Sequence, residues 1–417
     1  MKEVYSFTKS RELFSRAEKI IPSGIYGHQG PAEGCYIPVD AFPFYSERAQ
    51  GSYFWDADGN RFIDYMCGYG PNVLGYNDPD VNAAADAQRE KCDCVTIPST
   101  VMVDFADLLV DTVACADWAF FAKNGNDVTS LAVLTARAHT HRKKIVFFKG
   151  FYHGVSPWTQ KIDFPGILPE EVANNIYLPW NDFQAIEDVF RTQGDEITAV
   201  IGQPYMHGNF FDNTLPAEGF WKHVRDLCHK HGSLLIVDDV RAGFRLDLAG
   251  SDHFYGFKAD LICFCKALAN GYNVSALCGG EQFKSTVSGI SFTGSYWMSA
   301  VPFAAGIACI EKMKRKNLPE LLRSRGELLA SGLKAAAEKF GYDLRITGEP
   351  ALPYFRIAND PTLALHQEWV AECVRRGVFI TNHHNHFMNA SLTEADIAET
   401  VEIATEAFAV IKDRHTK

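Results

Sequence analysis

Lys266 is the residue of this sequence whose position most strongly suggests covalent chemistry. It follows the apolar run 259–265, which is typical of a buried strand, and precedes Ala267–Gly271. A lysine at the mouth of a buried strand is unfavourable unless its amine has a chemical task, because desolvation disfavours the ammonium form. One such task is a Schiff base with an aldehyde cofactor. The alternative is a lysine that extends its ammonium group to the surface.

An acidic pair, Asp238 and Asp239, also follows an apolar run, 233–237. Its carboxylates could cap a helix, bind a metal or hold the protonated nitrogen of a pyridine ring. Two adjacent carboxylates without a further acidic or histidine ligand nearby make a poor metal site. Pyridoxal phosphate needs both a lysine for its aldehyde and a carboxylate for its ring nitrogen, so Lys266 and the acidic pair together indicate this cofactor.

Two further segments could complete such a site. Asn124–Asp127 lies between a predicted strand and a predicted helix over 128–138. Gly125 allows close approach of the backbone, Asn126 suits a helix N-cap, and the free N–H groups of a first helical turn favour an anion. Tyr152 follows the next strand and could stack on a flat ring. Taken alone, each segment is more typical of an ordinary connecting loop than of a cofactor site.

The elements that position these residues are predicted by the pattern of the chain centre. From about 117 to 280, short apolar runs alternate with amphipathic stretches, which indicates an α/β fold with a mostly parallel sheet. Continuously apolar strands are typical of a sheet covered on both faces. In such sheets, ligand-binding and catalytic residues usually lie at the carboxyl ends of the strands. The predicted strands are 118–121, 144–148, 197–201, 233–237, 261–264 and 275–278.

The flanks predict a second, smaller domain. A helix is expected over 10–21, a hairpin over 51–64 with its turn at Asp58–Gly59, and helices over 299–314, 318–340 and 393–412. We therefore expect a large cofactor-binding domain over 71–310. Residues 1–70 and 311–417 would together form a smaller α+β domain.

Composition favours a cytoplasmic enzyme. The 417 residues are 47% hydrophobic and carry a net charge of −11, with acids and bases interspersed, which argues against nucleic acid as a partner. No apolar stretch reaches the length of a membrane span, and the N-terminus lacks an apolar signal core. The 11 scattered cysteines fit a reducing compartment and show no metal-binding spacing, so we expect neither a metal nor disulfides.

Four segments together carry a family resemblance. They resemble the signature segments of class III aminotransferases, which are pyridoxal-phosphate enzymes of fold type I. The N-terminal segments 17–24, 55–59 and 74–76 are similar to the branch that contains glutamate-1-semialdehyde aminomutase. The resemblance runs from about residue 10 to residue 410. The four segments are Asn124–Thr129, Phe151–Gly154, Ile236–Arg245 and Cys265–Gly271.

The resemblance implies a role for each candidate residue. Lys266 would carry the cofactor and act as the catalytic acid and base. Asp238 would hold the ring nitrogen and Tyr152 would stack on the ring. Gly125 and Asn126 would bind the phosphate. The family is dimeric with shared active sites, so a homodimer is expected.

Several positions depart from the family pattern. Asn126 stands where the family usually has serine or threonine, and Asp239 stands where it has glutamate. Gln203 replaces a glutamate and removes a negative charge. The segment 294–302 is longer than usual; within it, Ser295 is our choice for the hydroxyl that reaches the partner's phosphate, with Thr293 as the alternative.

The segments expected to contact the substrate favour transfer of an amino group from one molecule to another. The aminomutase binds a substrate carboxylate with an arginine that has no counterpart in residues 25–31 of this chain. Its Gly/Ser-rich lid is also absent, because residues 155–160 have a different sequence. We expect an aminotransferase acting between a primary amine and a keto acid such as pyruvate or 2-oxoglutarate. The segments 237–245 and 292–302 look most like transaminases of long-chain polyhydroxylated amines such as aminopentol. The alternative is an aminomutase of the glutamate-1-semialdehyde type, which needs no keto acid.

Overall fold

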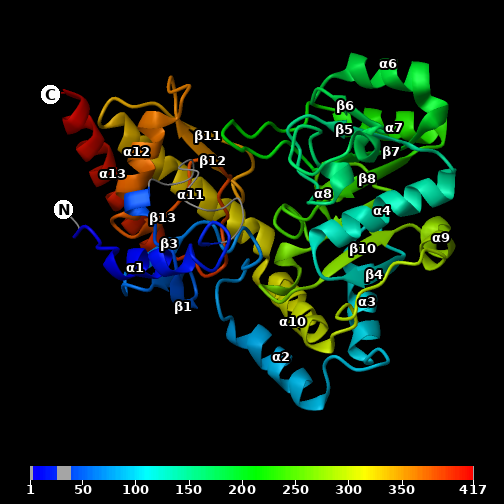
Figure 1. Ribbon diagram of the computed structural model, residues 1–417, viewed down its shortest axis with the longest axis horizontal. Helices are drawn as coiled ribbons and strands as arrows, with labels where there is room; N and C mark the ends of the chain where they lie inside the picture. Colours follow the sequence, from blue (N-terminus) through cyan, green and yellow to red (C-terminus); the bar gives the residue numbers. More distant parts are fainter. Residues whose placement is uncertain (1–2, 26–38, 417) are drawn as a thin grey trace. The chain divides into compact units, whose positions relative to one another are not determined.

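The structure is a computed structural model that describes residues 3–25 and 39–416. Contacts divide the chain into two compact units (Figure 1). Unit 1 comprises Met1–Asp78, His207–Thr214 and Glu320–Lys417, and unit 2 comprises Pro79–Met206 and Leu215–Pro319. These boundaries differ from the predicted ones at 70 and 310. They also assign the short segment 207–214 to unit 1, which the sequence pattern did not suggest.

Unit 2 is built on a seven-stranded sheet with the order β4-β10-β9-β8-β7-β5-β6. Strand β10 is antiparallel to both of its neighbours, and the other pairs are parallel. The predicted α/β fold with a mostly parallel sheet is therefore confirmed. The strands are β4 (Trp118–Ala122), β5 (Lys144–Phe148), β6 (Asn175–Leu178), β7 (Ile197–Gly202), β8 (Leu234–Asp238), β9 (Leu261–Phe264) and β10 (Ser275–Gly279).

The main core of unit 2 lies between this sheet and helix α4 (Gly125–Thr140). Val128, Leu131 and Ala132 of α4 are fully buried against apolar strand residues such as Ile236 and Leu277. Because both sides of this interface are apolar, burial holds the start of α4 firmly against the strand ends. The other helices of unit 2 are α2 (Pro79–Lys91), α3 (Val101–Thr112), α5 (Pro169–Val172), α6 (Phe183–Gln193), α7 (Phe220–His231), α8 (Ser251–Phe254), α9 (Lys284–Ser288) and α10 (Ala300–Lys316).

The amino ends of three strands are tied together by Arg142, which precedes β5. Its Nη1 donates to the carbonyl oxygens of His231 (2.6 Å), Ile197 (3.2 Å) and Gly194 (3.3 Å). Ile197 is the first residue of β7, Gly194 lies in the turn before it, and His231 ends α7, three residues before β8. One guanidinium thus satisfies several backbone acceptors at the edge of the sheet opposite the strand ends that carry Asp238 and Lys266.

Unit 1 contains a four-stranded sheet with the order β1-β2-β3-β13 and a two-stranded sheet of β11 and β12. Strands β2 and β3 are antiparallel and flank Asp58–Gly59, which confirms the predicted hairpin. The strands are β1 (Ser46–Gln50), β2 (Tyr53–Asp56), β3 (Arg61–Asp64), β11 (Leu344–Thr347), β12 (Tyr354–Ile357) and β13 (Val378–Phe379), and the helices are α1 (Thr8–Ala17), α11 (Leu318–Glu338), α12 (Ala364–Val374) and α13 (Glu394–Thr416).

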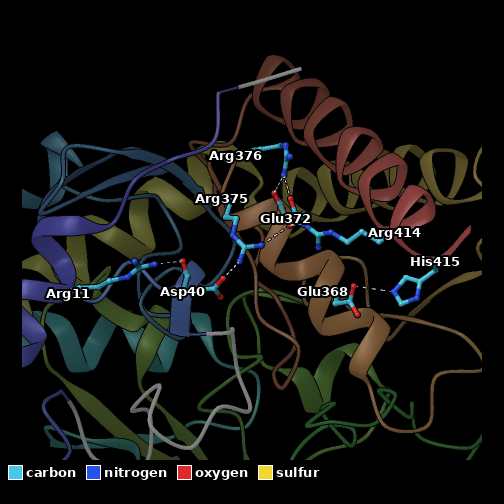
Figure 2. Close-up of polar contacts among 8 residues, drawn as sticks. All are labelled: Arg11, Asp40, Glu368, Glu372, Arg375, Arg376, Arg414 and His415. Carbon is cyan, nitrogen blue, oxygen red and sulfur yellow. Dashed lines mark hydrogen bonds and ion pairs between the residues drawn. The ribbon is translucent and has the colours of Figure 1, made fainter. Parts of the chain in front are cut away.

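A buried carboxylate joins α12 to α13 in unit 1 (Figure 2). Glu372 is paired with Arg375 (2.7 Å), Arg376 (2.5 Å) and Arg414 (2.7 Å), and Arg375 also pairs with Asp40. Burial raises the pKa of Glu372, but hydrogen bonds from Arg376 and Arg414 outweigh it and hold this pKa below its usual value.

No helix within residues 3–25 and 39–416 is both long enough and apolar enough to cross a membrane.

Candidate functional site

The candidate residues of unit 2 lie at the carboxyl ends of its strands. Strands β4 and β9 are both antiparallel to β10, so they run in the same direction as each other and as β8 and β5. The carboxyl ends of these strands therefore lie on the same side of the sheet, which is where ligands bind in open α/β sheets. This side is called the carboxyl edge of the sheet below. Gly125, Lys266 and Tyr152 follow β4, β9 and β5 respectively, and Asp238 is the last residue of β8.

Lys266 opens a 3-10 turn, η6 (Lys266–Ala269), directly after β9. Its φ of +34° is unfavourable for a residue with a side chain and persists only where the surroundings fix it. The preceding Cys265 Sγ lies 3.8 Å from the carbonyl oxygen of Lys123, which anchors this turn to the end of β4. Burial, reinforced by the positive charge of Arg241, lowers the pKa of Lys266 to about 7. A substantial fraction of the amine is then uncharged and nucleophilic near neutral pH.

Asp238 is held by a histidine from the loop that follows β5. His153 Nδ1 lies 2.7 Å from Asp238 Oδ2, and the two side chains are only 3% and 4% exposed. A carboxylate can only accept, so Nδ1 carries the proton in this pair. The backbone N–H of Val240 donates to the other carboxylate oxygen at 3.2 Å. Both carboxylate oxygens are thus fixed in place.

Asp239 has different partners from its neighbour. It accepts hydrogen bonds from Ser251 Oγ (2.6 Å) and from the Ser251 N–H (2.9 Å) at the start of α8. Burial raises the pKa of Asp239 well above its ordinary value. Because the two carboxylates turn to separate partners, they do not form a joint metal-ligating pair.

The turn before α4 differs in one respect from the prediction. Helix α4 begins at Gly125 with Asn124 as its N-cap, so the prediction that Asn126 caps this helix is wrong. Asp127 accepts the Asn124 N–H at 2.8 Å, which fixes the helix start earlier than expected. Asn126 Oδ1 instead accepts the N–H groups of Val155 and Ser156, both at 2.9 Å.

Gly125 is required by close packing in this turn. A Cβ atom added to it would lie 2.8 Å from Val240 Cγ1, which is closer than carbon atoms approach. The residue after Asp238–Asp239 therefore lies directly against the start of α4. The first N–H groups of an α-helix generally have no acceptor within the helix, which suits an anion. In this turn the Asp127 N–H already donates to the Asn124 carbonyl oxygen at 3.1 Å.

Tyr152 and Ser295 are the two exposed candidates. Tyr152 is 53% exposed, and its backbone N–H lies 3.4 Å from Gln203 Oε1. Gln203 therefore contacts the loop that carries Tyr152. Ser295 lies in the exposed segment between α9 and α10, where its carbonyl oxygen is 3.7 Å from Cys94 Sγ. Within the described ranges it makes no hydrogen bond to the other candidates.

Reasoning from the sequence missed three residues at this edge. His153 lies 85 positions from Asp238 along the chain, so their contact has no local signal. Arg241 and Arg245, in the segment that follows β8, are also buried. A charged residue shortly after a buried strand is the signal that could have identified them.

The donor set fits pyridoxal phosphate. The carboxyl ends of the strands carry a weakly basic amine, a carboxylate with fixed orientation, a helix start without a side chain, and an exposed aromatic ring. These belong to Lys266, Asp238, Gly125 and Tyr152. These match the aldehyde, the ring nitrogen, the phosphate and the flat ring of the cofactor. The fold and this site together define a pyridoxal-phosphate enzyme of fold type I.

Comparisons with known proteins agree. The family described as aminotransferase class-III matches residues 36–408, so the chain belongs to the class III aminotransferases. It is 42% identical over 407 residues to the aminopentol aminotransferase of Sphingopyxis macrogoltabida, which covers 97% of this chain and 95% of that protein. A glutamate-1-semialdehyde 2,1-aminomutase from Desulforamulus reducens is 31% identical over 97% of this chain and 98% of its own.

A solved structure shows the same relationship. The FumI protein of Sphingopyxis sp. MTA144, in its pyridoxal-phosphate internal aldimine form, superposes with a TM-score of 0.95 at 41% identity, covering 98% of each chain. The predicted family, fold type, cofactor and enzyme class are therefore confirmed. The chain is a pyridoxal-phosphate-dependent aminotransferase.

Proposed function

We propose that this enzyme removes the amino group of a primary amine carried on a long, hydroxylated carbon chain and transfers it to a keto acid such as pyruvate or 2-oxoglutarate. The observation that carries this proposal is 42% identity over nearly the whole chain to a protein named for its action on aminopentol, which is an amine of this kind. The aminomutase relative shares only 31%.

Lys266 is the proposed catalytic residue. The bound cofactor supplies an electron sink that stabilises negative charge on the substrate carbon. Lys266 first holds the cofactor and, once displaced by the amine, uses its Nζ to take the proton from that carbon and return it at the cofactor's exocyclic carbon. The low pKa of this amine, about 7, supports the role, because a general base works best when its pKa lies near the operating pH.

The remaining candidates are proposed to bind and orient. Asp238, aligned by His153, keeps the ring nitrogen protonated because opposite charges stabilise each other. Gly125 and Asn126 bind the phosphate through the first turn of α4, and Tyr152 covers the ring. Each role rests on the position of the side chain at the shared strand edge.

The assembly and location are further parts of the proposal. We propose a cytoplasmic homodimer in which Ser295 of the partner subunit donates to the phosphate. The exposure of the segment around Ser295 supports this, since a residue that crosses to a partner must lie at the surface. Size-exclusion chromatography with light scattering tests the dimer, and cofactor affinity of Ser295→Ala tests the hydroxyl contact.

The function is tested by the visible absorbance of the bound cofactor. An aminotransferase loses this band when amine is added alone, stays bleached, and recovers it when pyruvate or 2-oxoglutarate is added. An aminomutase would instead cycle without any keto acid. Lys266→Ala should lack the band and the reaction, whereas the matched control Lys222→Ala, an exposed lysine paired with Asp226, should retain both.

A further inference from the structure

Gln203 lies beside Asp238 at the carboxyl edge of the sheet. Strands β7 and β8 are parallel neighbours in which Gly202 pairs with Val237. Gln203 and Asp238 are the next residues of these two segments, so their backbones lie side by side at about the 4.8 Å spacing of adjacent strands. Each of the two is only 3% exposed.

The side chains of Gln203 and Asp238 contact the same loop. The Tyr152 N–H lies 3.4 Å from Gln203 Oε1, and the next residue, His153, donates to Asp238 Oδ2 at 2.7 Å. Because consecutive residues of one loop contact the two side chains, the Gln203 amide and the Asp238 carboxylate lie in the same part of the site.

The amide nitrogen of Gln203 has donors to spare. A glutamine that accepts through Oε1 still carries two N–H donors on Nε2. Within residues 3–25 and 39–416, the contact of Oε1 with the Tyr152 N–H is the only hydrogen bond of this side chain, and Nε2 makes none. Buried amide donors are nearly always paired, so a spare donor at a cofactor site indicates a contact with the bound molecule.

The strand order determines on which side of Asp238 this donor lies. Strand β8 lies between β9 and β7, and β4 lies beyond β9. Lys266 after β9 and Gly125 after β4 are therefore both on one side of Asp238. Gln203, which follows β7, is on the other side.

Three contacts of the proposed function orient the cofactor ring. The aldehyde carbon of pyridoxal phosphate is opposite the ring nitrogen, with the phosphate arm on one side of it and a phenolic oxygen on the other. The nitrogen is assigned to Asp238, the aldehyde to Lys266 and the phosphate to Gly125. In this orientation the phenolic oxygen faces the β7 side, where Gln203 lies.

We propose that Gln203 is a further cofactor-binding residue, whose Nε2 donates a hydrogen bond to the phenolic oxygen of pyridoxal phosphate. This inference rests on the cofactor orientation of the proposed function. The oxygen carries negative charge when it is ionised, so the hydrogen bond is charge-assisted. An ionised glutamate at position 203 would have no donor and would repel this oxygen, so the contact needs the amide.

Binding of two amine forms of the cofactor tests the contact without turnover. Pyridoxamine phosphate has the phenolic oxygen, its 3-deoxy analogue lacks it, and neither forms a Schiff base with Lys266. The full-length wild type, freed of cofactor, should bind pyridoxamine phosphate more tightly than the analogue at pH 8. In Gln203→Leu this preference should fall by about 10- to 100-fold, as expected for loss of a charge-assisted hydrogen bond. Tryptophan fluorescence measures each Kd.

A second variant separates the donor from the contact with the loop. Gln203→Glu keeps an acceptor for the Tyr152 N–H but removes the donor, so its preference should fall at least as far as in Gln203→Leu. The control is Gln193→Leu at the opposite edge, where Gln193 Oε1 accepts from Lys144 Nζ at 2.9 Å; its preference should match the wild type. A wild-type preference in Gln203→Glu or in Gln203→Leu would overturn the proposal.

Asp238→Asn tests the orientation on which the inference rests. It should weaken binding of both compounds by the same factor, because each contains the ring nitrogen. A preference that changes in Asp238→Asn but not in Gln203→Leu would place the phenolic oxygen at Asp238 and overturn the proposal. If the wild type fails to move nitrogen from amine to keto acid, the proposed function fails, and the binding preference alone then decides the role of Gln203.

Discussion

His153 donates from Nδ1 to Asp238 Oδ2 over 2.7 Å, although the two residues lie 85 positions apart in the chain. The same histidine accepts a hydrogen bond of 2.9 Å at its carbonyl oxygen from Thr129 Oγ1 of α4. One residue therefore connects the carboxylate at the end of β8, the loop after β5 and the helix after β4. The orientation of Asp238 depends on a side chain that itself needs no contact with the cofactor.

Replacing His153 should weaken cofactor binding. In His153→Ala, Asp238 loses a charged, buried hydrogen bond worth about 1–3 kcal/mol, so the Kd for pyridoxal phosphate should rise by about 5- to 100-fold. Quenching of tryptophan fluorescence during titration with the cofactor measures it. His253→Ala is the control, because His253 pairs with Asp247 at the same 2.7 Å but at the surface. An equal effect in both variants would argue against an orienting role.

Asn126 should serve the loop and the phosphate in separable ways. Asn126→Ala removes the acceptor of the Val155 and Ser156 N–H groups, so the loop should become more accessible to proteolysis. Asn126→Asp keeps an acceptor but adds negative charge at the helix start. It should retain loop protection yet bind pyridoxal phosphate about 10-fold more weakly, with little change for pyridoxal, which lacks the phosphate. Equal weakening for both compounds would place the phosphate elsewhere.

Lys266 should make the stability of the cofactor-free protein depend on pH. Its folded-state pKa of about 7 lies below the ordinary lysine value, so the unfolded chain binds more protons between about pH 7 and 10. The free energy of unfolding should therefore rise with pH across this window, by up to about 1.4 kcal/mol per pH unit from this group. Subtracting urea-unfolding data for Lys266→Met isolates the contribution. A pH-independent difference between the two proteins would contradict the lowered pKa.

Glu372 should be a determinant of stability rather than of catalysis. Its carboxylate is 3% exposed and pairs with three arginines (Figure 2), so Glu372→Gln should leave buried positive charge uncompensated and cost about 3–5 kcal/mol. Glu368→Gln on the same helix is the control, because its pair with His415 is exposed and should contribute less than about 1 kcal/mol. Chemical denaturation of both variants provides the comparison.

The same carboxylate should respond to acid. Because the pKa of Glu372 is held below its usual value in the fold, its contribution is present above about pH 4.3 and is lost as the pH falls further. For each protein, the loss of unfolding free energy relative to its own value at pH 7 is measured as the pH falls. This loss should begin at higher pH in the wild type than in Glu372→Gln, which already lacks the pair. Identical acid profiles would contradict this.

The central strands could be predicted because they are buried on both faces. The predicted strands 144–148, which is apolar after Lys144, and 261–264 match β5 and β9 in full. Strand β6 was missed since it lies at the edge of the sheet, pairs only with β5, and is only partly buried. Its residues Asn175–Leu178 need no apolar pattern. Helix α1 ends at Ala17 rather than residue 21, and Ile20 beyond it is largely exposed.

The site could be predicted where chemistry follows a strand. Lys266 and Asp238 each come at the carboxyl end of a buried strand, so a local pattern is enough to place them at one edge. The contact of His153 with Asp238 and the position of Gln203 beside Asp238 depend on the order of the strands, which the local pattern does not contain. The roles of these residues remain predictions for the experiments above.

Arg142 binds the strand starts at the edge of the sheet opposite Lys266. Three of these contacts use backbone carbonyls, which every amino acid provides, and a longer one of 3.4 Å reaches Ser233 Oγ. The side chains around the strand ends can therefore be exchanged during evolution while this anchor persists. A fold arranged in this way can acquire a new amine substrate through changes at one edge alone, and directed evolution of this enzyme should begin with the loops there.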